Sequence, residues 1–265
     1  MEHTHSAEPA TKPWATQRKD NWWVEPALVA IGFTLFIVYS TYRALLNQHF
    51  EIGTVISPFY SPNLGPFLSW WQWSPAILIL WIPAGFRATC YYYRKAYYRA
   101  YFMDPPGCGV GHFGGNKYCG ENVFPLVLQN LHRYMLYLAI LILGFLWYDA
   151  FIALTPAQIG GDFRFGLVNL IMFANVILLS GYTFGCHAFR HLVGGRLDCF
   201  SCSSGAKTQH KFWELVTKFN EKHMLWAWLS LFSVGFTDFY ISQLAAQAFV
   251  DPTFFGSALP LNHIL

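Results

Sequence analysis

The stretch VFPLVLQNLHRYMLYLAILILGFLWYDA, residues 123–150, decides the fold class of this chain. It is apolar along nearly its whole length, and a helix of about twenty such residues crosses the roughly 30 Å of hydrocarbon in a bilayer. Four other stretches are similar in length and composition. Together the five predict transmembrane helices over Ala27–Leu46, Ser74–Tyr93, Val123–Ala150, Phe165–Phe189 and Met224–Phe249. We therefore expect an all-α polytopic membrane protein built as a bundle of five transmembrane helices.

The composition supports this prediction. The chain is 54% hydrophobic and only 12% charged, which is too apolar for an ordinary soluble domain of 265 residues. Aromatic residues make up 19% of it and cluster near the ends of the predicted spans, as at Trp22–Trp23 and Trp70–Trp71. Aromatic belts of this kind are typical of membrane interfaces.

The distribution of basic residues predicts the orientation. Fourteen of the seventeen Lys and Arg residues fall in three polar segments that alternate with the spans and so share one face of the membrane. The positive-inside rule makes that face cytoplasmic, with the N-terminus inside and the C-terminus outside. The net charge of +3 thus reports orientation, and nothing in the chain resembles a nucleic-acid-binding motif. We expect a multi-pass protein of the cell membrane.

The predicted domain organisation is simple. Residues 1–20 form a polar N-terminal tail that we expect to be mobile, residues 21–250 form the membrane domain, and residues 251–265 form an outer tail. Two connecting loops on the predicted cytoplasmic face, Asp104–Glu121 and Gly194–His210, are rich in glycine. Such backbones make tight turns around compact features.

Cysteine and histidine residues gather on the same face. All six cysteines lie in or beside the predicted cytoplasmic segments. The cytoplasm is a reducing compartment, where thiols bind metals more often than they form disulfides. His187 and His191 are four residues apart, so on a helix they project about 40° apart and can hold one metal centre. His132 and His223 lie in the cytoplasmic half of two spans. Mixed Cys and His ligation suits zinc or a Rieske-type [2Fe-2S] cluster.

Polar residues inside the predicted spans form a second group. Gln129, His132 and Arg133 share one face of the third span, and Arg133 is expected to face protein, water or an anionic ligand, because a lipid-exposed charge at that depth is costly. Asp238 lies near the outer end of the fifth span, where it either pairs with another group or serves a proton path or quinone contact. Arg43 is expected at the outer interface with its charge reaching water.

Five motifs carry a resemblance to a known family. They are Asp104-Pro105-Pro106-x-Cys108-x-Val110, Leu128-Gln129-Asn130-Leu131-His132-Arg133-Tyr134, Cys186-His187-x-x-Arg190-His191-Leu192-x-Gly194-Gly195, Asn220-x-x-His223-Met224-x-x-Ala227-Trp228 and Thr237-Asp238-x-Tyr240. Together they resemble the five-helix membrane-anchor subunit of a bacterial succinate dehydrogenase or fumarate reductase. The resemblance is to the type with a membrane-embedded Rieske-type cluster in place of haem.

The resemblance implies a division of labour. A flavoprotein subunit would oxidise succinate, an iron-sulfur subunit would carry the electrons, and this chain, with a possible small additional membrane subunit, would pass them to a quinone, expected to be menaquinone. The chain would not act on succinate by itself. The implied cluster ligands are Cys108, Cys186, His187 and His191, with His132 and His223 as substitutes or supporting groups, and the candidate quinone-site residues are Gln129, Arg133, Asp238 and Tyr240.

Two alternatives stay open at this point. One is an anchor of the same class that binds haem b through His132 and a histidine of the fourth or fifth span. The other is a small transporter or channel with a structural zinc site, for which the Cys199-x-x-Cys202 pair would supply half of the ligands.

Overall fold

The computed structural model describes residues 12–68, 70–111, 122, 124, 126–155, 163–195, 198–256 and 259. The chain divides into two compact units. Unit 1 comprises residues 1–35 and 88–130, and unit 2 comprises residues 36–87 and 131–265.

Four described helices are long and apolar enough to cross a membrane. They are α1 (Val24–Leu46), the segment Val127–Ile152 that contains α4 (His132–Ile152), α5 (Leu167–Phe184) and α8 (His223–Ala245). Large apolar side chains along them remain exposed, including Leu35 at 65% and Phe232 at 57%, as expected where lipid covers the surface. The predicted class, an all-α polytopic membrane protein, is confirmed.

The second predicted span is shorter than expected. Helix α2 (Ala76–Ala88) has 13 residues, and at 1.5 Å per residue it is about 20 Å long. The helix stops before Cys90, whose extended backbone precedes a separate helix, α3 (Tyr91–Tyr97). This break was not predicted, because the apolar and aromatic run continues through it.

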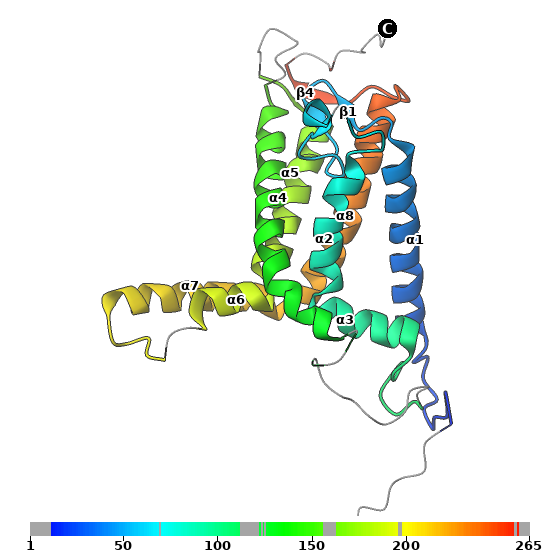
Figure 1. The fold of residues 1–265 in the computed structure, drawn as a ribbon, viewed down its shortest axis with the longest axis vertical. Helices are drawn as coiled ribbons and strands as arrows, with labels where there is room; N and C mark the ends of the chain where they lie inside the picture. Colours follow the sequence, from blue (N-terminus) through cyan, green and yellow to red (C-terminus); the bar gives the residue numbers. More distant parts are fainter. Residues whose placement is uncertain are drawn as a thin grey trace, which may run out of the picture. The chain divides into compact units, whose positions relative to one another are not determined.

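The core of unit 2 lies among α2, α4, α5 and α8 (Figure 1). Buried side chains of all four helices meet there, among them Ile79, Ile142, Met172 and Ile241. Helices α5 and α8 approach closely at Gly181, where an added side chain would collide with the indole of Trp226. This close packing fixes the positions of the inner ends of both helices.

Short strands and loops cover one end of unit 2. Strands β1 (Glu51–Ile52) and β2 (Val55–Ile56) pair antiparallel, as do β3 (Phe165–Gly166) and β4 (Thr253–Phe255), and a short 3-10 helix, η1, spans Gly65–Phe67. We call this the outer end, because the charge pattern predicts it outside the cell. The opposite end, with residues 83–87, 131–135 and 182–226, is called the inner end.

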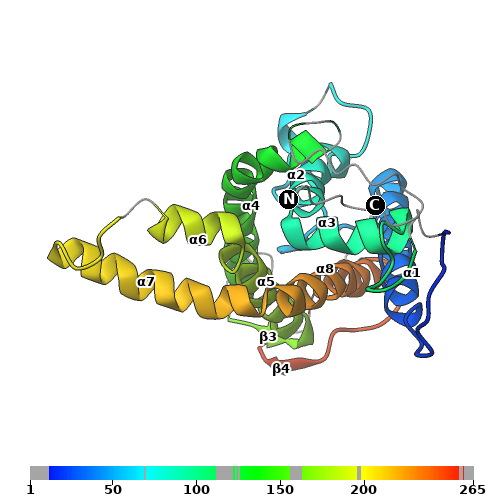
Figure 2. The same ribbon diagram turned by 90° about the horizontal axis from the view of Figure 1, so that it is seen from below.

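Two helices cross the inner end of unit 2. Helix α5 ends at Phe184, α6 (His187–Gly194) follows, and α7 (Ser204–Glu221) leads back to α8. Helices α6 and α7 lie side by side and run across the direction of α4, α5 and α8 (Figures 1 and 2).

Unit 1 joins the N-terminal segment to the chain before α4. It contains the first part of α1, α3, the π-helical turn η2 (Tyr98–Phe102) and most of the 3-10 helix η4 (Leu126–Leu131). Thr16 bridges to Val110, and the Arg18 guanidinium donates to the Cys108 carbonyl. Residues 12–20 thus lie against the loop that carries Cys108. The domain boundaries expected from the sequence stay predictions.

Candidate functional site

A row of aromatic rings connects two histidines at the inner end of unit 2. The imidazole of His132, the first residue of α4, stacks on Phe86 of α2 with ring centroids 4.8 Å apart. Phe86 meets Tyr182 of α5 at 5.4 Å, and Tyr182 stacks on His223 of α8 at 5.0 Å. Helices α2, α4, α5 and α8 therefore contribute one ring each to a continuous row of ring contacts. The four residues are far apart in the sequence, so their proximity was not predicted.

Arg87 brings a positive charge to this row. Its guanidinium carbon lies 4.6 Å from the centre of the Tyr182 ring, a cation–π arrangement. The same group donates to the Ser230 hydroxyl at 3.0 Å and to the Ala227 carbonyl at 3.3 Å. These contacts hold the charge between α2, α5 and α8.

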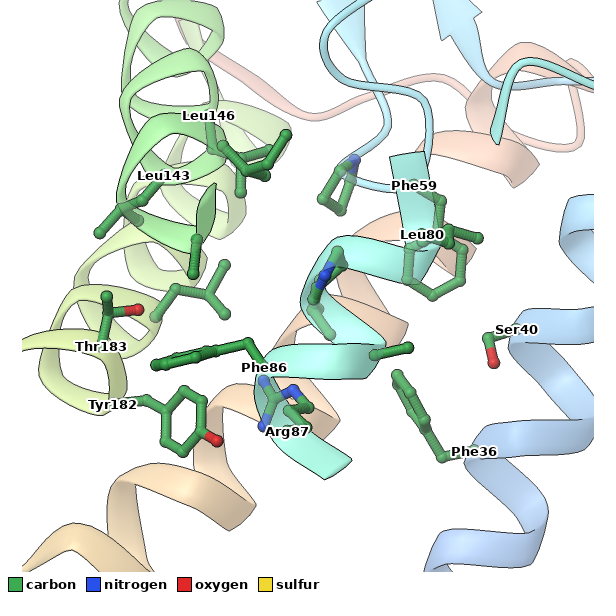
Figure 3. A pocket seen from close by; sticks show the side chains of 17 residues that line it. Phe36, Ser40, Phe59, Leu80, Phe86, Arg87, Leu143, Leu146, Tyr182 and Thr183 are labelled. Atoms are coloured by element: carbon green, nitrogen blue, oxygen red, sulfur yellow. The ribbon is translucent and has the colours of Figure 1, made fainter. Parts of the chain in front are cut away.

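A cavity of about 140 Å³ opens beside these residues (Figure 3). Its wall is almost entirely apolar and includes Leu80, Leu143 and Leu146. Phe86, Arg87, Tyr182 and Thr183 line it in its lower part in Figure 3, whereas Phe59 and Leu80 line it higher up. An apolar molecule with a polar end matches this lining.

The expected cluster ligands lie in different surroundings. Cys186 is buried and caps the start of α6, where its sulfur accepts from the Phe189 amide at 3.2 Å. His187 and His191 follow on α6 and are exposed. His191 Nδ1 lies 3.0 Å from Nη2 of Arg133. Cys108 is exposed and belongs to unit 1.

The described residues do not form a ready metal centre. Within the ranges that the structure describes, no three Cys, His, Asp or Glu side chains lie close enough together to hold a metal ion. Cys119 and His112 lie outside the described residues. Cys199 and Cys202 are joined as a disulfide, which differs from the reduced thiols expected on a cytoplasmic face. The expected cluster ligands are divided between unit 1, which holds Cys108, and unit 2, which holds Cys186, His187 and His191, so the [2Fe-2S] cluster stays a proposal.

The haem alternative involves His132 and a histidine of the fourth or fifth span. In the structure His132 stacks on Phe86, and His223 stacks on Tyr182. Histidine binds iron through an in-plane ring nitrogen, which ring stacking does not involve, so haem b stays the alternative cofactor.

The candidate quinone residues at the inner side are separated by the unit boundary. In unit 1, the Gln129 amide donates to the Tyr97 hydroxyl at 2.8 Å, and burial raises the pKa of that phenol. In unit 2, Arg133 lies in the first turn of α4 and is exposed. Arg133 was expected to face protein, water or an anionic ligand; its guanidinium lies against His191, and its place in a quinone site stays a prediction.

The candidates at the outer end belong to buried networks. Asp238 is fully buried and accepts from Arg43 Nε at 2.8 Å, from the Tyr39 hydroxyl at 2.6 Å and from the Ser57 hydroxyl. Arg43 is only 4% exposed, so the expectation that its charge reaches water is wrong. Tyr240 donates to Asp251 at 2.8 Å, and Asp251 pairs with the buried Arg164.

Sequence reasoning missed the residues that line the cavity near the aromatic row. Arg87 was counted only as one of the basic residues that set the orientation. Phe86 and Tyr182 gave no signal, because one residue in five of this chain is aromatic.

The fold and site together define a class of protein, a multi-pass helical membrane subunit whose spans enclose an apolar cavity with a cationic group in its wall. The model of the family described as actinobacterial succinate dehydrogenase subunit SdhC matches residues 24–247. The chain therefore belongs to this family, and the resemblance to the succinate dehydrogenase membrane anchor is confirmed.

A solved structure supports the same conclusion. The chain is similar to a chain of the Mycobacterium smegmatis Sdh1 complex in the apo form, with 38% sequence identity and a TM-score of 0.82. The similarity covers 95% of this chain and 98% of that chain. No curated protein matches the sequence.

Proposed function

We propose that this chain anchors a succinate dehydrogenase in the membrane and delivers its electrons to a quinone in the cavity beside Arg87. The observation that carries the proposal is the cavity itself, which combines a long apolar wall with Arg87 and Tyr182. A quinone likewise has an apolar part and a polar part, since an apolar tail follows a headgroup with two carbonyl oxygens.

Arg87 has the chemistry that quinone reduction needs. As electrons reach the quinone, negative charge builds on its oxygens until protons arrive. A fixed guanidinium stabilises that charge, and it acts strongly where apolar walls exclude water. Tyr182 Oη is a second hydrogen-bonding group in the lining, and the ring of Tyr182 lies against the same guanidinium.

Other candidate residues define competing positions for the headgroup. Gln129 in unit 1 and Arg133 in unit 2 are the other inner candidates. Asp238 and Tyr240 offer an outer one, but their polar atoms already bind Arg43, Tyr39, Ser57 and Asp251. Arg87 is favoured because it lines a cavity.

The partners follow from family membership. We propose that the iron-sulfur subunit docks at the inner end, that the flavoprotein subunit binds on that subunit, and that a small additional membrane subunit completes the complex. The basic segments support a cytoplasmic inner end and hence the orientation with the N-terminus inside. In this orientation α2 also crosses the membrane, as a short span in addition to the four long ones.

The proposed cofactor is a Rieske-type [2Fe-2S] cluster held by Cys108, Cys186, His187 and His191, with His132 and His223 nearby. Its support is the mixed Cys and His chemistry of these residues. No electron-transfer step is derived through it. A Rieske-type EPR signal in the purified complex that is lost in His191→Ala would support the cluster, whereas a haem absorbance band without such a signal would refute it.

The quinone site is tested with Arg87→Leu in the assembled complex. We expect reduction of quinone by succinate to fall by roughly a hundredfold, because the group that stabilises the developing charge is gone. Reduction of a soluble dye should continue, since those electrons leave before the membrane. Both rates are measured on the same preparation.

Two further variants make the test specific. Arg87→Lys keeps the charge and should retain more quinone activity than Arg87→Leu. Arg99→Leu removes a basic residue of the same polar segment that does not line the cavity, and should leave the quinone rate unchanged. Equal loss of quinone and dye reduction in Arg87→Leu would contradict the proposed site.

A further inference from the structure

The hairpin of α6 and α7 has two chemically different sides. Successive residues of a helix are about 100° apart, so residues 212, 215 and 219 of α7 form one stripe. These are Phe212, Leu215 and Phe219, and the first two are 57% and 49% exposed. On the same helix, Glu214 and Lys218 lie on the opposite side of the line of contact with α6.

The contact with α6 fixes how α7 is rotated. The Arg190 guanidinium lies 4.4 Å from the centre of the Trp213 ring and donates to the Thr217 hydroxyl at 2.9 Å. Gly194 leaves no room for a side chain beside Trp213. Because Trp213 and Thr217 face α6, the apolar stripe and the charged side must lie to either side of that contact.

The apolar stripe faces the transmembrane helices. At its C-terminal end the Phe219 ring lies 5.8 Å from that of Trp226, in the first turns of α8. On α6, the Phe189 ring lies 5.0 Å from that of Phe184, the last residue of α5. Both helices of the hairpin thus turn apolar side chains toward the level of the spans, and α7 extends beyond α4, α5 and α8 (Figure 2).

We propose that the α6–α7 hairpin binds the surface of the lipid bilayer in which the spans lie, with Phe212 and Leu215 inserted among the lipids. The hairpin is joined to two spans by short connections, Gly185–Cys186 on one side and Lys222 on the other, and it crosses their ends (Figure 1). A helix held there with its apolar stripe toward the spans meets the bilayer interface.

The charges of α7 agree with a lipid surface as the occupant. Lys211 and Lys218 lie about one turn before and after Leu215, at the border of the apolar stripe, and Lys207 lies further round on the same side. From there their long side chains reach water and the lipid phosphates. Glu214 lies among them on the same side. The apolar surface of α6–α7 is therefore bordered by cations, as in helices that lie in the interface plane.

The test uses a fluorescent amino acid placed at single positions of the full chain. The protein is reconstituted into vesicles of phosphatidylcholine and phosphatidylglycerol whose acyl chains are brominated, because bromine quenches only a fluorophore that reaches the chains. Positions 212 and 215 report the apolar stripe, and positions 214 and 218 are matched controls one to three residues away.

We expect several-fold quenching at positions 212 and 215, and fluorescence at positions 214 and 218 close to that in unbrominated vesicles. Quenching at none of the four positions would overturn the proposal. An unquenched but blue-shifted emission at positions 212 and 215 would also overturn it and assign the stripe to a protein partner. Equal quenching at all four positions would mean that α7 is not oriented by the interface. Since none of these readouts involves quinone, they are independent of the proposed function.

Discussion

The polar groups at the two ends of unit 2 differ in burial and in their partners. At the outer end, Arg43 and Asp238 are almost fully removed from solvent and bind each other, and Arg164 pairs with Asp251 in the same manner. At the inner end, His187, His191 and Arg133 are exposed, and Arg87 lines a cavity.

This difference indicates that the outer end serves stability and that the inner end serves exchange with other molecules. Buried charges that already have partners hold helices and loops in place, and they have no capacity left for a ligand. Exposed histidines and a cation beside an apolar cavity can still bind one. We therefore assign the structural role to the outer end and the electron-accepting role to the inner end.

The largest effect is expected from Asp238→Ala. This change leaves the Arg43 guanidinium buried without its carboxylate, at a cost of about 3–5 kcal/mol. The yield of assembled complex and its thermal unfolding temperature in detergent should both fall. The double variant Arg43→Leu with Asp238→Leu removes both charges and should recover part of the loss. If Asp238→Ala unfolds at the wild-type temperature, the ion pair does not stabilise the outer end.

A smaller effect is expected from Ser61→Ala. The Ser61 hydroxyl donates to the carboxyl of Asp149, which is 8% exposed. Loss of one partner of a buried acceptor costs about 1–3 kcal/mol, so a lowered unfolding temperature is expected with quinone activity retained. Ser40→Ala is a suitable control, because the Ser40 hydroxyl donates only within its own helix. Equal unfolding temperatures for Ser61→Ala and Ser40→Ala would argue against a stabilising hydrogen bond between the loop that carries Ser61 and α4.

The smallest effect on stability is expected from Arg133→Leu. Its side chain is exposed in the first turn of α4, where substitutions usually change stability by less than about 0.5 kcal/mol. Arg43→Leu, its matched counterpart at the outer end, should lower the unfolding temperature much more. An opposite ranking of the two variants would reverse the assignment of roles to the ends.

The sequence predicted the class of fold well because membrane spans leave a local signal. Runs of apolar residues located four long helices to within a few residues at most of their ends. The break after Ala88 was missed, because aromatic residues continue the apolar run beyond it. Helix α4 also starts later than predicted, since the residues before His132 form a 3-10 helix.

The site was only partly predictable, because its contacts join distant parts of the chain. Arg43 and Asp238 are 195 residues apart, and no local pattern shows that one neutralises the other. His132 and His223 were recognised as candidates by residue type alone. Their link through Phe86 and Tyr182 depends on the packing of four helices, which a single sequence does not reveal.

The central claim, that the quinone binds at the inner end, is tested most directly by photoaffinity labelling. The assembled complex is illuminated with a quinone that carries an azido group on its ring, and the labelled peptides are identified by mass spectrometry. We expect labels within residues 83–87 or 179–183, and we expect these labels to be lost when excess unlabelled quinone competes. Competed labels confined to residues 39–61 or 238–251 would contradict it and place the quinone at the outer end.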